Sequence, residues 1–462
     1  MSIRVYDSLT QELVDFSPLV PGQVSMYVCG PTVQSEPHIG HLRSALVYDL
    51  WARWFSYRGY QVTMVRNVTD IDDKILEKAD GEEWWALASR VERLFHQATD
   101  ALRIQPPALE PRATGDIPAM VSLISTLIER GHAYVAEDNS GDVYFDVASW
   151  SDYGALTRQS PDDLEPSADG TGQKRSPHDF ALWKGHKDTE PETAQWPAPW
   201  GSGRPGWHLE CSAMSARYLG PEFDIHGGGL DLRFPHHENE LAQSRAAGHA
   251  FAHYWMHSAL VTVSGKKMSK SLGNSIFARE WLEKAPAIVI RYALSTAHYR
   301  SSIDLHEGVL EESASAFARI TGFLDRTKSL GGVGQLPESF AEAMDDDLSI
   351  PVALAVVHDT VREGNHALDE GDSARASVAA GQVREMLACL GLNPEAEEWS
   401  SEEEASAGEH LSLLMDAIVS ARDRAREDKD FALSDSLRDV VDQAGIDLTD
   451  TPDGTKWSPR GR

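Results

Sequence analysis

The feature that most constrains the fold is a strand–helix–strand pattern near the start of the chain. Residues 24–29 form a short, mostly apolar run that ends at Gly30-Pro31, and residues 61–68 alternate like a strand. Between them, apolar residues recur every three to four positions over 39–57, as on the buried face of a helix. Two strands joined by such a helix form a βαβ crossover, which makes the strands parallel. The sequence therefore predicts an α/β protein with a parallel sheet.

The chain is long enough for several domains, because its 462 residues exceed the roughly 100–200 residues of a typical one. Strand and helix patterns of the core occupy 1–114 and resume over 206–260, and one strand is expected over 254–263. Residues 115–205 are expected to be an insertion, with a hairpin over 132–147 and irregular loop over 160–206. The later segments are predicted as a junction over 261–305, a helical bundle over 306–392, an acidic linker over 393–410 and a small C-terminal unit over 411–462.

The composition excludes some classes of protein but does not identify a ligand. Forty-two Lys and Arg against 72 Asp and Glu give a formal charge of −30, yet a local basic patch can still bind a polyanion. The apolar runs are far shorter than the roughly 18 residues of a membrane span, and the first residues lack the apolar stretch of a signal peptide. Three cysteines cannot form a disulfide framework. We therefore expect a cytoplasmic protein without membrane contact.

The segment Pro37-His38-Ile39-Gly40-His41 stands where the long helix is predicted to begin. A helix N-terminus offers free N–H groups and a positive dipole end, and Gly40 would let a phosphate or a base approach the backbone. His38 and His41 are one turn apart, so both imidazoles could donate to phosphate oxygens as negative charge develops. Position alone equally allows an ordinary helix start with two histidines.

Residues 265–274, Gly-Lys-Lys-Met-Ser-Lys-Ser-Leu-Gly-Asn, form a second cluster. Three lysines and two serines between glycines predict a mobile cationic loop, whose ammonium and hydroxyl groups could follow a leaving pyrophosphate. The alternative is a solvated turn. Three lysines within five residues are less expected by chance in a chain with so large a negative charge.

A third cluster is spread along the sequence. His236 and Glu240 are four residues apart, so a helix would place both on one face, while Cys29 ends the first strand and Cys211 lies on a later helix. Two thiolates, an imidazole and a carboxylate make a plausible zinc ligand set. The other interpretation is two buried cysteines in the core beside an ordinary helix pair, because the chain has no C-x-x-C motif.

In this order, the three clusters resemble the class I aminoacyl-tRNA synthetases. The H-I-G-H signature stands unaltered at 38–41 and K-M-S-K-S at 267–271, with Gly229-x-Asp231 between them. Within that class, the chain resembles the cysteinyl-tRNA synthetase family over essentially its whole length. The supporting segments are YVCGPT at 27–32, NVTDIDDK at 67–74, GWHLECS at 206–212, DIHGGG at 224–229, KDFA at 429–432 and DTPDGT at 450–455. One departure is Gln34-Ser35-Glu36, where many relatives have a tyrosine-containing segment, and it concerns the wall beside the nucleotide.

The resemblance implies a Rossmann-type catalytic core with an insertion, a junction domain that carries the lysine loop, a helical bundle that meets the tRNA stem and a small anticodon-binding unit. It also implies one zinc ion per chain, Mg²⁺ accompanying ATP, and a monomer. The implied site residues are Cys29, Cys211, His236 and Glu240 for zinc, His38, His41, Lys267 and Lys270 for catalysis, Thr32, His38, Gly40, His41, Gly229, Lys270 and Asn274 for the nucleotide, and Thr69, Trp207 and Asp231 for the amino acid.

The implied reaction joins L-cysteine to the 3′-terminal ribose of tRNA(Cys) through cysteinyl-adenylate. The enzyme would have to distinguish cysteine from serine, which differ by one atom. Shape alone separates such near-isosteres only about 10–200-fold, whereas zinc binds a thiolate far better than a serine hydroxyl. Two alternatives remain at this point. One is the related ligase that joins cysteine to glucosaminyl-inositol in mycothiol synthesis, which needs no anticodon-binding tail. The other is a zinc-stabilised RNA-binding protein without catalysis, which would have no use for His38, His41 and Lys270 together.

Overall fold

The computed structural model describes residues 2–159, 174–268, 273–399, 402–427, 429–451 and 454–459. The chain divides into two compact units, Met1–Pro394 and Glu395–Arg462. Within the described part of the chain, each helix is too short or too polar to cross a membrane.

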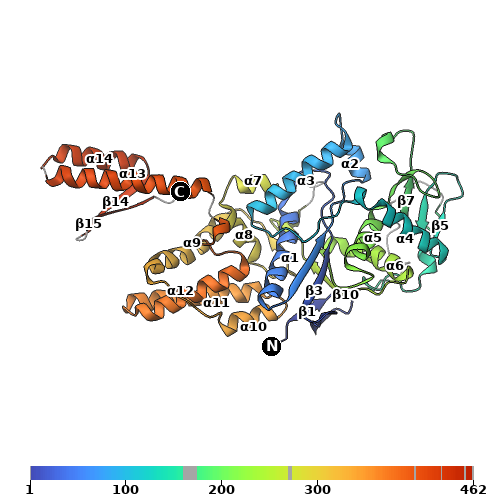
Figure 1. Ribbon diagram of the computed structural model, residues 1–462, viewed down its shortest axis with the longest axis horizontal. Coiled ribbons are helices and arrows are strands. Elements are labelled where there is room, and N and C mark those ends of the chain that lie inside the picture. Colours follow the sequence, from blue (N-terminus) through green and yellow to red (C-terminus); the bar gives the residue numbers. More distant parts are fainter. Residues whose placement is uncertain are drawn as a thin grey trace. The chain divides into compact units, whose positions relative to one another are not determined.

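A four-stranded parallel sheet forms the centre of the first unit, with strand order β10-β9-β3-β4. The bounds are β3 (Gln23–Val28), α1 (Ile39–Tyr57), β4 (Gln61–Arg66), β9 (Glu222–Gly229) and β10 (Phe251–Ser258). The chain adds β4 on one side of β3 and later adds β9 and β10 on the other side. Figure 1 labels β3 and β10 of this sheet. The predicted α/β fold with a parallel sheet is confirmed, and the strand order reverses between β3 and β9.

Helix α1 lies in the middle of the first unit. Leu42, Leu46, Trp51 and Trp54 have no exposed surface. Burial of each such side chain contributes about 1.5–3 kcal/mol to folding. Because core contacts hold α1 along its length, its first turn, which carries the histidine pair, is held rigidly at the edge of the sheet.

The insertion between the two halves of the core contains its own antiparallel sheet, of order β5-β6-β7-β8. Its elements are α4 (Ile117–Glu129), β5 (Ala133–Val135), β6 (Val143–Phe145), β7 (Phe180–Gly185) and β8 (Gly203–Pro205). The predicted hairpin is confirmed as β5 and β6. The prediction of irregular loop was wrong at β7 and β8, because surrounding glycines and prolines masked the short apolar run at the start of β7, which is buried. Residues 160–173 lie outside the described residues.

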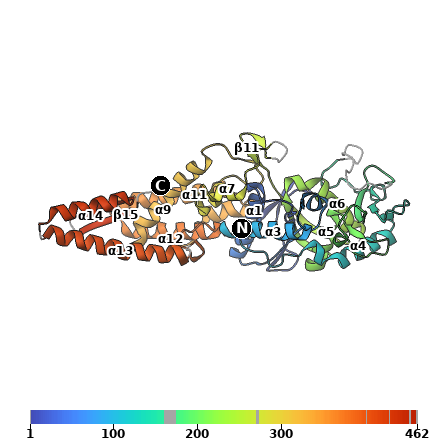
Figure 2. The same ribbon diagram turned by 90° about the horizontal axis from the view of Figure 1, so that it is seen from above.

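The single strand predicted over 254–263 is two strands in two sheets. β10 ends at Ser258, and β11 (Val261–Val263) pairs with β12 (Lys266–Lys267) and β13 (Ile303–Asp304). Between them the Ala259 N–H donates to the Tyr299 carbonyl, which turns the chain out of the first sheet. An alternating pattern cannot reveal such a change of partner. β11 therefore carries the lysine loop on a separate small sheet, seen at the top of Figure 2.

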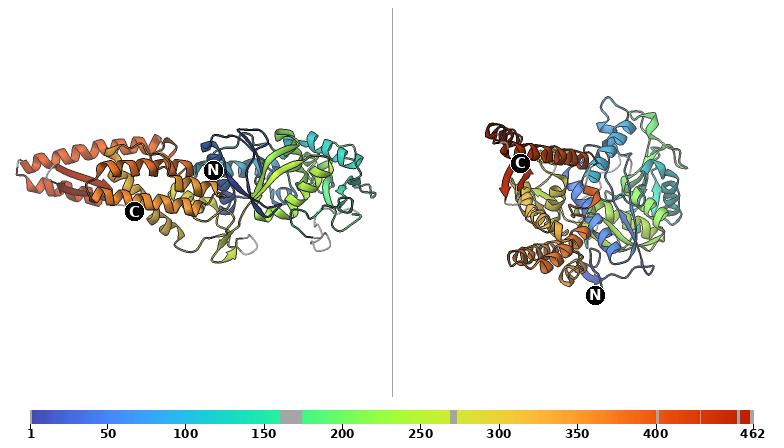
Figure 3. Two further views of the ribbon diagram at one scale, coloured as in Figure 1. Left: turned by 90° about the horizontal axis from the view of Figure 1, so that it is seen from below. Right: turned by 60° about the vertical axis from the view of Figure 1, so that its left-hand side comes forward.

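The predicted run of helices after Leu305 is confirmed. Its members are α9 (Val309–Thr327), α10 (Glu338–Asp345), α11 (Ile350–Asp369) and α12 (Ser373–Leu390). They gather on the opposite side of the central sheet from the insertion (Figure 3). The apolar faces of these helices belong to the same continuous core as α1.

A buried ion pair connects α1 with α8 (Ala287–Ser295), the helix before the bundle. Both Asp49 and Arg291 are fully buried, and their N–O distance is 2.5 Å. Asp49 also accepts from Arg53, and Arg291 also donates to the Leu390 carbonyl. The pair therefore joins α1, α8 and the end of α12.

Replacing Asp49 by Asn should lower the free energy of unfolding by about 3–5 kcal/mol, because Arg291 would stay buried without an opposite charge. Urea unfolding followed by circular dichroism measures the change. The control is Asp359→Asn, since the Asp359–Arg362 pair is largely exposed and should contribute less than about 1 kcal/mol. Equal losses in both variants would contradict the prediction.

The second unit consists of α13 (Glu402–Glu427), α14 (Phe431–Gln443), β14 (Ile446–Thr451) and β15 (Gly454–Pro459). The two strands form an antiparallel pair, and Met415, Val441 and Ile446 make a small core. α13 takes in residues 402–410, which the sequence assigned to an acidic linker, because glutamate and alanine favour helix even where charge repels. The strand β15 was not predicted.

Candidate active site

A cavity of about 310 Å³ lies where the first turn of α1 meets the carboxyl ends of β3 and β9. In α/β sheets, ligands bind at the carboxyl ends of the strands, where the strand order reverses. The cavity occupies this position. Its lining includes members of all three predicted clusters, namely Cys29, His38, Gly40, His41 and Met268. It also includes the predicted site residues Thr32, Trp207, Gly229 and Asp231.

The histidine pair forms the start of α1. The rings of His38 and His41 stack with centroids 3.7 Å apart, and the His38 N–H donates to Nδ1 of His41 over 3.2 Å. Gly40 lies between them, and a Cβ there would come within 3.0 Å of the His38 ring and 3.1 Å of Met268 Cε. Gly40 therefore allows the two imidazoles and the start of the lysine loop to share one small region of the cavity.

Each glycine at the end of β9 makes room for a different side chain. A Cβ on Gly227 would stand 2.3 Å from the Tyr48 ring, and one on Gly228 would stand 2.8 Å from the His237 ring. A Cβ on Gly229 would stand 2.5 Å from an Asp231 carboxylate oxygen. The glycine run is thus a requirement of packing that brings Asp231 to the cavity.

The predicted metal ligands converge, although they come from three separate parts of the sequence. The Sγ atoms of Cys29 and Cys211 are 3.5 Å apart, and Glu240 Oε1 lies 3.4 Å from Cys29 Sγ and 3.1 Å from His236 Nε2. All four donor atoms lie within 4.8 Å of one another, and all four residues are buried. Zinc–ligand bonds of about 2.0–2.3 Å require donor atoms roughly 3.3–3.8 Å apart in a tetrahedron, so this donor set fits zinc.

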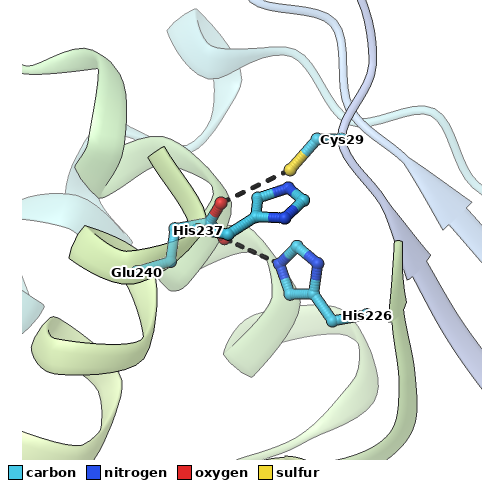
Figure 4. A group of neighbouring side chains, drawn as sticks. All are labelled: Cys29, His226, His237 and Glu240. Carbon is cyan, nitrogen blue, oxygen red and sulfur yellow. Dashed lines mark hydrogen bonds and ion pairs between the residues drawn. The ribbon is translucent and has the colours of Figure 1, made fainter. Parts of the chain in front are cut away.

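A second group of possible ligands overlaps the first and was missed by the sequence analysis. It consists of Cys29, His226, His237 and Glu240 (Figure 4). His226 Nε2 lies 2.8 Å from the second carboxylate oxygen of Glu240, so it can orient a carboxylate that binds metal through the other oxygen. His237 contacts His257 over 2.8 Å. The signal was present in the segments DIHGGG and PHHENE, but the sequence could not show that they meet.

Burial sets the protonation of this cluster. Burial raises the pKa of the Cys29 thiol well above its usual value, and it raises the pKa of Cys211 to about 11. Burial likewise lowers the pKa of His257 to about 3, and it lowers the pKa of His237 well below the usual value. Without a cation, burial therefore favours neutral thiols at Cys29 and Cys211 and neutral imidazoles at His237 and His257. A metal ion would reverse this preference by favouring thiolates.

Thr69 lies behind the cavity wall rather than among its lining residues. Its Oγ1 donates to Glu210 over 2.6 Å and accepts from the Asn67 amide over 3.2 Å. Asn67 Oδ1 in turn accepts from the Gly30 N–H. Burial raises the pKa of Glu210 well above its usual value. Glu210 and Asn67 were not predicted, and they hold Thr69 beside the strand end that carries Cys29.

The structure describes only part of the lysine loop. Lys267 belongs to β12, and Met268 reaches the cavity beside Gly40. Lys270 lies outside the described residues, as do Ser269 and Ser271. After the loop, the Ile39 N–H donates to the Ile276 carbonyl, and the Ala278 N–H donates to the Pro37 carbonyl. Ile276 and Ala278 lie two and four residues beyond the predicted Asn274. The chain that leaves the loop is therefore bound to the segment that begins α1.

The segment Gln34-Ser35-Glu36, which departs from the family pattern, makes two polar contacts with neighbouring elements. Gln34 lines the cavity, and its Oε1 accepts from Lys78. Glu36 forms an ion pair with Arg279 over 3.3 Å. Arg279 lies in α7 (Ala278–Leu282), directly after the segment that is bound to the start of α1. The departure from the family pattern therefore keeps this wall attached to its neighbours through polar contacts.

Comparisons with known proteins agree with this geometry. Residues 15–315 match the family model for the class I (C) tRNA synthetase catalytic domain, and residues 339–393 match the DALR domain. The chain is 56% identical to the cysteine–tRNA ligase of Clavibacter michiganensis subsp. michiganensis over 100% of both chains. It is also 56% identical to that of Leifsonia xyli subsp. xyli over 99% of both chains.

A solved structure supports the fold. Methionyl-tRNA synthetase of Mycobacterium tuberculosis bound by methionyl-adenylate aligns with a TM-score of 0.60 at 16% identity, over 81% of this chain and 91% of that one. The matching catalytic domain spans well over half of the chain, and the curated relatives match it from end to end. The chain therefore belongs to the cysteine–tRNA ligase family of the class I aminoacyl-tRNA synthetases.

Proposed function

We propose that this enzyme activates L-cysteine with ATP and transfers it to the 3′-terminal ribose of tRNA(Cys). The observation that carries the proposal is one cavity lined both by the His38–His41 pair and by Cys29 of a buried two-thiol cluster. The pair suits an adenylating site, and the cluster suits selection of a thiol. The full-length identity to cysteine–tRNA ligases supports both parts.

In the first step, the cysteine carboxylate attacks the α-phosphorus of ATP, and cysteinyl-adenylate and pyrophosphate form. A carboxylate is already a nucleophile, so the step needs positioning and charge stabilisation rather than a general base. His38 and His41 donate to the phosphate oxygens, while Thr32, Gly40, Gly229 and Asn274 hold the nucleotide and Lys267 and Lys270 follow the leaving pyrophosphate. In the second step, the ribose hydroxyl attacks the acyl carbon and AMP leaves.

Cys29, Cys211, His236 and Glu240 would hold one zinc ion per chain. When bound, zinc prefers a thiolate to a serine hydroxyl, which stays protonated and binds poorly. Trp207 and Asp231 line the cavity, and Asp231 would bind the substrate ammonium. Thr69 supports the amino-acid site from behind. Mg²⁺ would enter with ATP, because ATP is bound by proteins together with this ion. The enzyme would act as a cytoplasmic monomer.

Cysteine-dependent exchange of pyrophosphate into ATP tests the first step. We expect exchange with L-cysteine and at least a thousandfold less with L-serine, because the two amino acids differ in the atom that the cluster recognises. Charging of tRNA(Cys) in the same preparation tests the second step. Exchange without charging, together with transfer of cysteine to glucosaminyl-inositol, would support the mycothiol-type alternative. The DALR domain and the end-to-end identity to cysteine–tRNA ligases do not favour that alternative.

Removal of the second unit should separate the two steps. A chain that ends at Pro394 keeps the first compact unit, including the cavity and the four proposed ligands. We expect it to form cysteinyl-adenylate at about the full-length rate. Its KM for tRNA(Cys) should rise at least tenfold, because basic residues of α13 such as Arg424 and Arg426 would no longer contact phosphates.

Steady-state charging at several salt concentrations measures this effect. The full-length enzyme should show the steeper loss of tRNA affinity with salt, since each phosphate contact releases counterions. An unchanged KM and an unchanged preference among anticodon variants would contradict an anticodon-binding role of the second unit.

A further inference from the structure

The amino-acid end of the cavity lacks an assigned partner for one of the two charges on its substrate. Asp231 lines the cavity, and the proposed function pairs its carboxylate with the ammonium of cysteine. The other two residues proposed to bind the amino acid carry no charge. Trp207 offers an indole ring, and Thr69 offers a hydroxyl whose Oγ1 already hydrogen-bonds Glu210 and Asn67. The carboxylate must nevertheless be held close to the α-phosphate, which is also an anion. Bringing two anions together requires a cation nearby.

Two permanently charged cations occur among the cavity-lining residues that the structure describes, Arg66 and Lys74. The Arg66 guanidinium is bound by Glu110 through two nitrogens, at 2.7 and 3.0 Å, and Arg66 is only 5% exposed. Its charge is therefore already neutralised inside the protein. Lys74 forms no ion pair within 4.0 Å with any carboxylate in the described part of the chain. Its side chain is exposed, as a group that meets an incoming ligand has to be.

Lys74 lies at the amino-acid end of the cavity. Its Nζ stands over the Trp207 ring, 5.8 Å from the centroid. Trp207 itself stacks on His236 with centroids 4.2 Å apart, and His236 is one of the four proposed zinc ligands. The Trp207 indole therefore lies between the Lys74 ammonium and the His236 ring of the ligand cluster. In cysteine, the carboxylate carbon is three covalent bonds from the sulfur, so a thiol held at the cluster keeps its carboxylate in this neighbourhood.

The backbone that carries Lys74 is firmly anchored. It belongs to the short helix α2 (Asp73–Lys78), and its N–H donates to the Asp72 side chain over 2.9 Å. The preceding residue, Asp73, binds both Lys184 and Arg204 of the insertion, and the following residue, Ile75, has no exposed surface. Contacts on both sides fix the Cα of Lys74 while its ammonium remains available.

We propose that Lys74 is a substrate-binding residue whose ammonium holds the carboxylate of the amino acid in position for adenylation. This inference rests on the proposed function and deepens it. Lys74 complements Asp231, so that the site recognises both charges of the zwitterion while the cluster recognises the thiol. This proposal has a specific consequence for binding. Loss of Lys74 should lower the affinity for ligands that carry the carboxylate and should leave the affinity for ligands without one nearly unchanged.

Calorimetric titration of the zinc-loaded full-length enzyme tests this consequence with two ligands. L-Cysteine carries thiol, ammonium and carboxylate, and cysteamine lacks only the carboxylate. In Lys74→Met, which retains a long apolar stem over Trp207, affinity for cysteine should fall about tenfold or more. Affinity for cysteamine should change less than about twofold. Lys74→Arg keeps the charge and should restore most of the lost cysteine affinity.

The matched control is Lys284→Met, which makes the same substitution at an exposed lysine that is outside the cavity lining. It should leave both affinities unchanged. Equal losses for cysteine and cysteamine in Lys74→Met would overturn the proposal, because they would show that Lys74 only supports the Trp207 ring. No loss for either ligand would overturn it as well. Failure of the proposed function is a separate result, since the wild-type enzyme would then bind neither thiol.

Discussion

Cys211→Ser should remove zinc from the purified enzyme and reduce cysteine affinity at least a hundredfold, while ATP affinity changes little. Serine offers a neutral hydroxyl in place of a thiolate, and zinc binds such an oxygen poorly. The side chain lies 3.5 Å from Cys29 Sγ inside a buried cluster, so water cannot readily replace the lost ligand. Metal analysis by mass spectrometry and calorimetric titration with cysteine and with ATP measure the three effects.

The matched control is Cys389→Ser. Cys389 is the third cysteine of the chain and is also buried, but it lies in the helical bundle on α12, outside the ligand cluster. It should retain zinc and cysteine affinity in full. If the Cys211 and Cys389 variants contained equal zinc, the assignment of Cys211 as a ligand would be wrong.

Lys270→Ala should lower the kcat of adenylation by about 10²–10³ and change cysteine affinity less than about threefold. A positive charge that meets the leaving pyrophosphate is most valuable in the transition state, where one such contact contributes roughly 2.7–4 kcal/mol. Binding of the ground state should suffer less for the same reason. Pyrophosphate exchange gives the kcat, and calorimetric titration gives the affinity.

Lys284→Ala serves as the control for lost charge. Lys284 is exposed just after α7, beyond the segment that is bound to the start of α1. Its variant should adenylate cysteine at the wild-type rate. If Lys270→Ala also reached the wild-type rate, the lysine loop would be a solvated turn without a part in the reaction.

The local spacing of apolar residues was sufficient to predict the helix and strands around the site. Helix α1 spans Ile39–Tyr57, as its apolar spacing predicts, and β3 and β4 differ from prediction by one or two residues. These elements are predictable because each is buried along a continuous face, which leaves a regular period in the sequence. The same regularity misled at β10, since two consecutive strands that join different sheets can share one alternating pattern.

The sequence by itself determined the parallel sheet, the position of His38 and His41 at a helix start, and the motifs that place the chain in its family. Only the tertiary structure decided which distant residues meet. Cys29 directly follows β3, and Cys211 lies on α5 (Trp207–Leu219). His236 lies just before α6 (Glu238–Ala246), and Glu240 lies in its first turn. Likewise, nothing in the spacing of Lys74 and Trp207 predicts their contact. The physical reason is that periodicity records which face of an element is buried, whereas the partner on that face depends on how the sheets and helices pack.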